Sequence, residues 1–554
     1  MRVEVEFDVG AQMRDGVTLR ANVYRPAASG PWPTLLMRTP YGKDLHGTRW
    51  CGVDPVQAAG RGYIVVIQDT RGRFASDGVW DPFRFERLDG YDTVEWAARR
   101  PAANGRVAMY GGSYCGNTQW LPAMERAPSL AAISPLMTWS DPLDGLFARG
   151  GAVELGLAVP WSLETGIDHV KRLEVGDTEL QPRVDGLIDE CDRLGEHGYW
   201  ELPVHHMAAL RRHCVRDLGT IRALDDPAVI ESCSVAGAHP RVVVPSLHIG
   251  GWYDVFAQGT LDNYAAMAAL GREARLIVGP WTHDTFCDPI GERLFGMRAS
   301  RDGPPIHPHG DVIDLQLAWL RGHLVPNADA ELPDSPVRIF VMGRNEWRDE
   351  SCWPLQCAVS RRWFLRAGGL LTTGRPDPDE PATCFTYDPA DPAPTIGGHT
   401  VMWPGYPAGP RDQAPLEARH DVCVFTSEPL QRDMEVTGRV RVVLCAESSA
   451  PSTDWVARLC DVHPDGRSYN LCDGIVRIAQ GSNACRSIEI DLWSTSNVFL
   501  AGHRLRVHVT SSSFPRWDRN LNTGRQREAR HEVARQRVYH DRDGASYIDV
   551  PTVD

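Results

Sequence analysis

Hydrophobic and polar residues alternate with two different periods in the first part of the chain. Four short apolar runs end in turn residues and are typical of strands: LRANVYRP, TLLMRTPY, YIVVIQDTRG and RVAMYGG. The β-branched run in the third indicates a strand buried on both faces. DGYDTVEWAARRP and NTQWLPAMERAP have helical spacing instead. Strands that alternate with helices predict an α/β domain with a mostly parallel sheet.

The pattern changes twice further along. Between residues 144 and 240, VDGLIDECDRLGEHG and HHMAALRRHCVRDL have helical spacing, which predicts a helical cap inserted into the α/β domain. Strand signals resume in RVVVPSLHIGGWYD and ARLIVGPWTHD, so we assign residues 1–143 and 241–350 to the α/β core. From 351 to 554 short alternating runs are separated by turns, which predicts a jelly-roll β-sandwich.

Composition narrows the class of protein. The 554 residues carry a formal net charge of −14, which argues for solubility and against a nucleic-acid partner. The opening MRVEVEFDVG has no secretory pattern, and no apolar run approaches the ~20 residues of a membrane helix. The 14 cysteines are scattered without C-x-x-C spacing, which indicates reduced thiols. We expect a cytoplasmic protein without a membrane partner, and the sequence leaves open whether it forms a homodimer.

A glycine-flanked serine follows the RVAMYGG strand. The stretch GGSYCG places Ser113 at a sharp turn before a helix, but Cys115 stands where G-x-S-x-G has its second glycine, which comes one residue later at Gly116. Such a turn exposes the hydroxyl and sets the next backbone N–H, that of Tyr114, at a helix N-terminus, where negative charge is stabilised. Ser113 is a candidate nucleophile, although such serines also occur in plain turns.

The partners of a nucleophilic serine have candidates in the right order. In α/β hydrolases an acid and then a histidine follow the serine, each after a strand. Asp254 follows VVVPSLHIGGWY and His283 follows RLIVGPWT. We predict that His283 takes the serine proton and Asp254 orients the imidazole. Asp69 precedes Ser113, so we interpret it with Arg71 as a structural turn containing an internal ion pair.

Six stretches resemble the bacterial cocaine esterase and X-prolyl dipeptidyl peptidase family of serine hydrolases: GVTLRANVYRP, RTPYGK, VIQDTRGRFASDG, GGSYCGNTQW, GGWYDVF and VGPWTHD. The resemblance continues into the last third of the chain and is weakest in the cap. It implies an α/β-hydrolase core with an inserted helical cap, a C-terminal jelly roll and a triad of Ser113, Asp254 and His283. The family motif reads G-x-S-Y-x-G, which accounts for Gly116.

The resemblance also implies that the hydroxyl of Tyr41 lies in the oxyanion hole, which Tyr114 would complete with its backbone N–H. A phenol can donate to a developing oxyanion, and losing one such donor typically costs ~3 kcal/mol of barrier. A packed aromatic is the plainer interpretation of Tyr41. For substrate binding we nominate Trp139, Trp161 and Phe256, each of which also fits plain packing.

The residues after Asp254 bear on the reaction. Members that resemble α-amino-acid ester hydrolases hold the substrate ammonium with carboxylates there, whereas this chain has Val255, Phe256 and Ala257. A buried ammonium would have no partner. We therefore expect a small-molecule ester with a bulky acyl or aryl group. The alternatives are an amide hydrolase of the acylase or X-prolyl/aminopeptidase type, an acyltransferase using the same acyl-enzyme, and an inactive binding scaffold.

Metal and cofactor chemistry is not expected from the sequence. His205, His206 and His213 gather in the cap, but no carboxylate or cysteine spacing beside them supports a metal site. We interpret them as part of a solvated helix face.

Overall fold

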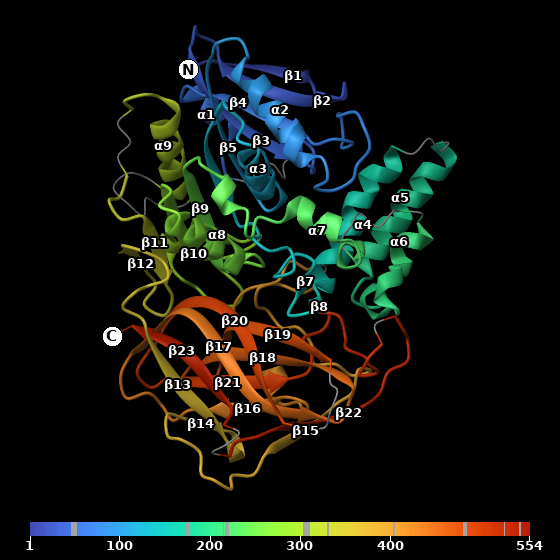
Figure 1. Cartoon of the computed structure of the whole chain (residues 1–554), viewed down its shortest axis with the longest axis vertical. Coiled ribbons are helices and arrows are strands. Elements are labelled where there is room, and N and C mark those ends of the chain that lie inside the picture. The colour runs from blue at the N-terminus through green and yellow to red at the C-terminus, as the bar shows by residue number, and fades with distance from the viewer. Residues whose placement is uncertain are drawn as a thin grey trace.

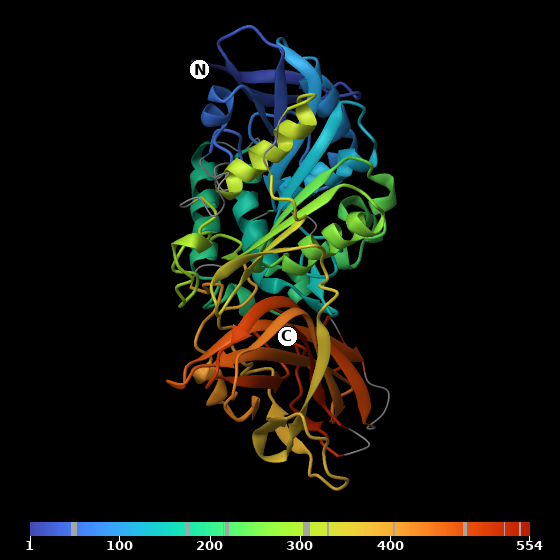
Figure 2. The same cartoon turned by 90° about the vertical axis from the view of Figure 1, so that its left-hand side faces the viewer.

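The computed structural model describes the chain except residues 46–51, 173–176, 214, 216–220, 303–310, 329–331, 403–404, 480–484, 526, 542–544 and 554. Figures 1 and 2 show an elongated molecule, with an α/β part around the N-terminus, cap helices on one side and a β-sandwich at the other end. In the part of the chain that is described, no helix has the length and apolarity to cross a membrane.

A ten-stranded sheet forms the α/β part. Its seven central strands, from β4 to β11 in spatial order, are parallel, and the remaining pairs at its two ends are antiparallel. The spatial order is β1 (Val3–Gln12), β2 (Thr18–Pro26), β4 (Ile64–Asp69), β3 (Trp32–Thr39), β5 (Ala103–Gly112), β6 (Leu130–Leu136), β9 (Ser246–Tyr253), β10 (Ala274–Thr282), β11 (Val337–Val341) and β12 (Glu346–Glu350).

Helices cover both faces of this sheet, which is why its central strands are continuously apolar. Along β4, Ile64 and Val66 join one hydrophobic cluster, and Val65 and Ile67 join another. Helices α2 (Glu86–Ala98) and α3 (Tyr114–Met124) contribute to the first cluster, and α1 (Pro55–Gly60) and α9 (Val312–Leu324) to the second. Helix α8 (Ala257–Ala269) packs against β9 and β10.

The cap lies beside the α/β part and has a separate hydrophobic cluster, to which Phe514 of the C-terminal part also belongs. The predicted helical region also contains a short hairpin, β7 (Ala148–Arg149) and β8 (Ala152–Val153), and its histidine-rich helix is shorter than expected. Its helices are α4 (Leu155–Lys171), α5 (Asp177–Asp192), α6 (Ala208–Arg212) and α7 (Pro227–Cys233).

The C-terminal part is a β-sandwich with mostly antiparallel strands and a short helix, α10 (Ala414–Glu417). Cys445 and Cys485 form a disulfide here, which differs from the expectation of reduced thiols alone. The strands are β13 (Val359–Arg366), β14 (Leu370–Thr372), β15 (Thr383–Tyr387), β16 (Cys423–Thr426), β17 (Met434–Ser448), β18 (Ser452–Val462), β19 (Ser468–Ala479), β20 (Arg486–Phe499), β21 (Arg504–Thr510), β22 (Ala534–Val538) and β23 (Tyr547–Val553).

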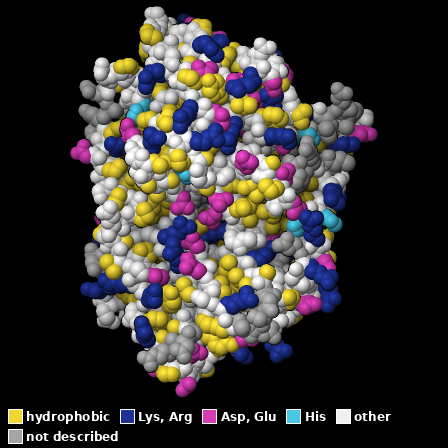
Figure 3. All heavy atoms as spheres, viewed as in Figure 1, with side chains coloured by type: hydrophobic (Ala, Val, Ile, Leu, Met, Phe, Trp, Pro, Cys, Tyr) yellow, Lys and Arg dark blue, Asp and Glu magenta, His cyan; other side chains and the backbone are white. Residues whose placement is uncertain are grey.

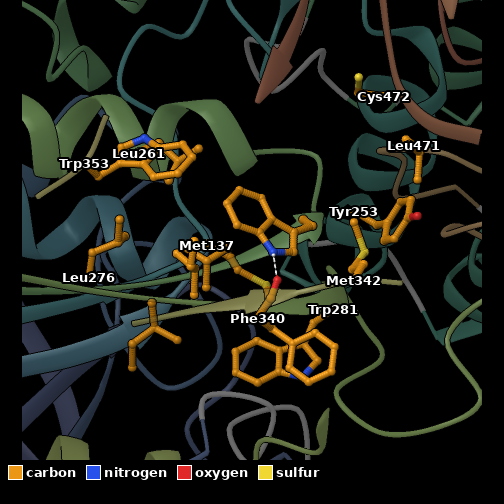
Figure 4. Packing of buried hydrophobic residues seen from close by; sticks show 14 of the residues in the cluster. Met137, Tyr253, Leu261, Leu276, Trp281, Phe340, Met342, Trp353, Leu471 and Cys472 are labelled. Carbon is orange, nitrogen blue, oxygen red and sulfur yellow. Dashed lines mark hydrogen bonds between the residues drawn. The ribbon is translucent and has the colours of Figure 1, made fainter. Parts of the chain in front are cut away.

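One hydrophobic core runs from the α/β sheet into the sandwich. Figure 4 shows Tyr253 and Met342 of the α/β part beside Leu471 and Cys472 of β19, and all four belong to one cluster. The Tyr253 hydroxyl donates to the backbone oxygen of Asn470 at 3.3 Å. The two parts therefore share buried surface. On the face drawn in Figure 3, basic and acidic side chains are interspersed.

Candidate active site

Ser113 lies in a strained turn between β5 and α3. It caps the helix with φ 57° and ψ −124°, a region that non-glycine residues rarely adopt. Its backbone N–H donates to the carbonyl oxygens of Leu136 and Met137 at 3.0 and 3.1 Å. The turn is thus held by the end of the neighbouring β6, and its geometry is that of a nucleophile elbow.

The structure brings Asp254 and His283 together. Each directly follows its strand, β9 or β10, and these strands are parallel neighbours that end at the same edge as β5. His283 Nδ1 lies 2.5 Å from Asp254 Oδ1, and the other carboxylate oxygen accepts the N–H of Phe256 at 3.0 Å. Asp254 is fully buried, so the hydrogen bond to His283 is shielded from water.

Tyr41 lies just beyond β3, which neighbours β5. Burial raises the pKa of its hydroxyl above the ordinary value, although hydrogen bonds with Trp161 and Ser113 act in the opposite direction. The indole N–H of Trp161 donates to the Tyr41 oxygen at 3.3 Å. The phenol is therefore protonated at neutral pH and close to Ser113, as an oxyanion donor has to be.

Tyr114 is the first residue of α3, so its backbone N–H has no partner inside the helix. Its side chain is occupied elsewhere. The hydroxyl donates to Glu86 at 3.0 Å and accepts the N–H of Phe83 at 2.9 Å. Glu86 in turn pairs with the buried Arg38 at 2.5 Å. This buried network fixes the start of the helix that carries the N–H.

An apolar cavity opens onto Ser113. The three nominated substrate-binding residues all contribute to its wall, together with Tyr41 and Tyr114. Trp139 and Phe256 are almost fully buried, whereas Trp161 is partly exposed on α4. None of the lining residues carries a charge. They are Tyr41, Phe83, Ser113, Tyr114, Trp139, Leu146, Phe147, Leu157, Ala158, Trp161 and Phe256.

Sequence reasoning missed part of this wall. Phe83 stacks on Tyr114 with ring centroids 4.6 Å apart, and Phe147 meets Phe83 edge-on at 6.2 Å. Both lie in irregular segments where hydrophobic periodicity carries no signal. Leu157 lies on a cap helix, and its inward direction depends on how the cap docks.

The Asp69 turn is structural, but its predicted ion pair is wrong. Asp69 accepts the backbone N–H groups of Lys43 and Ala75 at 2.7 and 3.2 Å. Arg71 instead bonds Asp89 with two nitrogens at 2.9 and 2.7 Å. Asp69 thus serves to close the loops after β3 and β4.

Two family models match the chain. One, described as X-Pro dipeptidyl-peptidase (S15 family), matches residues 15–285, and one, described as X-Pro dipeptidyl-peptidase C-terminal non-catalytic domain, matches residues 332–549. The first spans the site residues and the cap. The second begins before β11 and β12, which complete the α/β sheet.

Individual relatives match over nearly the full length. Cocaine esterase of Rhodococcus sp. (strain MB1 Bresler) is 35% identical over 578 residues, covering 99% of this chain and 98% of the relative. A solved aminopeptidase from a marine sediment archaeon, Thaumarchaeota archaeon, has a TM-score of 0.80 at 23% identity, covering 100% of this chain and 96% of its own. A solved α-amino acid ester hydrolase has a TM-score of 0.81 at 24% identity, with coverage of 99% and 96%. These two structures show a shared fold.

Proposed function

We propose that this chain, which belongs to the X-Pro dipeptidyl-peptidase (S15) family, hydrolyses an ester with a bulky acyl or aryl group through an acyl-enzyme on Ser113. The chain is a serine hydrolase of the carboxylic ester hydrolase type. The residue roles and the substrate class are the proposed part.

The proposed reaction begins with proton transfer. His283 takes the proton of the Ser113 hydroxyl as the oxygen attacks the ester carbonyl carbon. Asp254 holds Nδ1–H of the ring and stabilises the imidazolium that forms. The tetrahedral oxyanion accepts hydrogen bonds from the Tyr41 hydroxyl and the Tyr114 N–H.

Collapse of this intermediate breaks the bond to the alkoxy group. His283 returns the proton to the leaving oxygen, and the acyl group stays on Ser113. Water, deprotonated by the same ring, then attacks the acyl-enzyme and releases the carboxylic acid. Acylation of Ser113 and hydrolysis of the acyl-enzyme both use the same oxyanion donors.

The uncharged aromatic cavity beside Ser113 is the observation that carries the substrate class. An apolar acyl or aryl group gains by burial there, roughly 25 cal/mol for each Å² removed from water. A free ammonium would meet no carboxylate in this wall, and Val255, Phe256 and Ala257 after the triad acid are buried and uncharged.

A mass measurement after a fluorophosphonate probe tests the proposal, alongside turnover of p-nitrophenyl acetate, p-nitrophenyl benzoate and the matching p-nitroanilides. We expect one adduct on Ser113 and preference for the benzoate ester. Ser113→Ala should lose both adduct and turnover without loss of fold, and the exposed Ser351 supplies the control Ser351→Ala. An adduct without turnover would favour acyl transfer to an acceptor other than water. Faster cleavage of the p-nitroanilides than of the esters would favour an amidase. An active Ser113→Ala variant would show that Ser113 is not the nucleophile.

A further inference from the structure

Three potential metal ligands meet at one end of the sandwich, in strands that the proposed reaction does not use. Strands β18 and β21 are antiparallel, and their last paired residues are Val462 and Arg504. His463 and His503 directly follow and precede these residues, so they face each other across the ladder. Side chains alternate along a strand, which places Asp461 on the same face as His463. The register therefore gathers one carboxylate and two imidazoles.

The side chains are in contact distance. His503 Nδ1 lies 2.8 Å from Asp461 Oδ1, and His463 Nε2 lies 3.6 Å from Asp461 Oδ2. The imidazole ring centroids are 4.4 Å apart. One ligand atom from each of the three residues falls within 4.8 Å of the others.

Two atoms in this cluster are buried without a hydrogen bond. Asp461 Oδ2 and His463 Nε2 are buried and have no hydrogen-bond partner among the described residues. The Asp461 side chain is only 1% exposed. Native proteins rarely leave a buried carboxylate oxygen unsatisfied, and a bound ion is one of the recognised reasons. The two atoms lie 3.6 Å from each other, which is too far for a hydrogen bond and suits two ligands of one ion.

We propose that Asp461, His463 and His503 bind one divalent cation of the zinc type. Zinc takes imidazole nitrogen and carboxylate oxygen at about 2.0–2.2 Å, so neighbouring ligands of a tetrahedral site lie roughly 3.4 Å apart. The separations of 2.8 and 3.6 Å involve the two different oxygens of Asp461, and small side-chain shifts bring either oxygen and both imidazoles to this spacing. Calcium and magnesium prefer oxygen-only sets, which this cluster does not offer.

The described residues offer three ligands, which leaves the fourth tetrahedral position for water, and His463 is the ligand whose side chain is 19% exposed. The cation joins the turn after β18 to the turn before β21. The His463 ring also packs edge-on against Tyr469 at 5.0 Å, and Arg293 of the α/β part stacks on Tyr469 at 5.5 Å. The site thus strengthens the sandwich where it meets the α/β part.

Zinc retention by untagged, full-length protein tests the site. The protein is stripped with EDTA, equilibrated with Zn²⁺, desalted and analysed for metal content and melting temperature. We expect about one zinc per chain and a zinc-dependent rise in melting temperature. His463→Phe keeps the ring that packs on His503 and Tyr469 but removes the ligand nitrogen, so zinc affinity should fall at least about tenfold.

His531→Phe is the matched control, because His531 is an exposed histidine that does not belong to the cluster. It should retain zinc and the melting shift. Ester turnover and circular dichroism report whether His463→Phe folds; if it does not, Asp461→Asn carries the same test. Equal zinc retention by the wild type and the ligand variant, or no retention by either, would overturn the proposal.

Discussion

A single hydroxyl distinguishes the two interpretations of Tyr41. The indole N–H of Trp161 donates a hydrogen bond to the Tyr41 hydroxyl oxygen. Burial raises the pKa of the Tyr41 hydroxyl, so it keeps its proton at neutral pH. Its oxygen is thus already satisfied as an acceptor, and its O–H is left to donate toward Ser113. The oxyanion role stays a prediction, because a packed tyrosine also satisfies its hydroxyl when it is buried.

Tyr41→Phe should lower kcat roughly a hundredfold with little change in KM, because the donor acts mainly on the transition state. Trp161→Phe keeps an aromatic wall and removes only the N–H, so its loss of kcat should be smaller. Steady-state kinetics on one p-nitrophenyl ester compares the two variants. An unchanged kcat in Tyr41→Phe would make it a packing residue.

His248 gives a pH-dependent contribution to stability. Burial lowers its pKa to about 3, and its ring contacts the Ser246 hydroxyl at 2.9 Å. Between pH 6.5 and about 3 the unfolded chain is protonated at this residue and the folded chain is not. The stabilisation is therefore complete above pH 6.5 and falls by up to ~1.4 kcal/mol per pH unit below it.

His248→Gln should reduce the loss of stability below pH 6.5. The free energy of unfolding in urea, measured at several pH values, gives this pH dependence. His531→Gln is the exposed control and should leave the slope unchanged. A variant with the wild-type slope would show that other groups cause the acid sensitivity.

For single residues, the order of serine, acid and histidine along the chain was the strongest sequence signal for the candidate site. Asp254 and His283 could be predicted because each directly follows an apolar strand, and parallel strands end at one edge. The partners of Arg71 could not, since Asp89 comes from the next helix and only tertiary packing brings it close. The same holds for Phe83 and Phe147 in the cavity wall.

The elbow between β5 and α3 explains its unusual glycine spacing. Gly111 has φ 132°, and a Cβ there would lie 2.8 Å from the Cys115 side chain. A Cβ on Gly116 would lie 2.7 Å from Thr138 Cβ. The second required glycine is therefore the one that faces the loop after β6, while position 115 has room for a side chain.

Gly116→Ala should destabilise the protein by about 1–3 kcal/mol through this overlap, despite alanine's higher helix propensity, and should lower turnover by shifting Ser113. Cys115→Ala shortens a tolerated side chain and should cost less on both measures. Urea unfolding and ester turnover of the two variants make the comparison. A neutral Gly116→Ala would mean that α3 can move away from Thr138 without loss.

At the element scale, the central strands could be predicted and the edges could not. Strand β4 is apolar throughout because helices cover both faces. The edge strands β1 and β12 are largely half-buried or exposed, so their composition resembles that of loops. Helix α3 ends at Met124, before Pro128, and it contains Pro122.

The whole molecule has a continuous core, with buried links between its parts. Arg149 of the cap hairpin stacks on Trp493 at 3.6 Å and donates to the backbone oxygens of Asp473 and Asp491 at 2.7 and 2.9 Å. Three predicted segments thus fold into one packed unit. Sequence periodicity identifies such segments but contains nothing about their mutual docking.

Scanning calorimetry should therefore show one main unfolding transition for the full chain, because neither part keeps its buried surface when the other unfolds. Arg149→Met should lower that transition temperature and leave a single peak, because it removes the contacts with Trp493, Asp473 and Asp491 but not the shared hydrophobic cluster. Two well-separated transitions in the wild type would contradict the shared core.

Helix α4 connects the sandwich to the cavity wall. Just before the helix, Glu154 accepts the Trp517 indole N–H at 2.8 Å, and in its first turn Gly156 donates its backbone N–H to the Arg516 backbone oxygen at 2.9 Å. Trp161 lies on the same helix, at the cavity. If the proposed function holds, substitutions at Arg516 or Trp517 should change which acyl groups fit the cavity, although neither residue lines it.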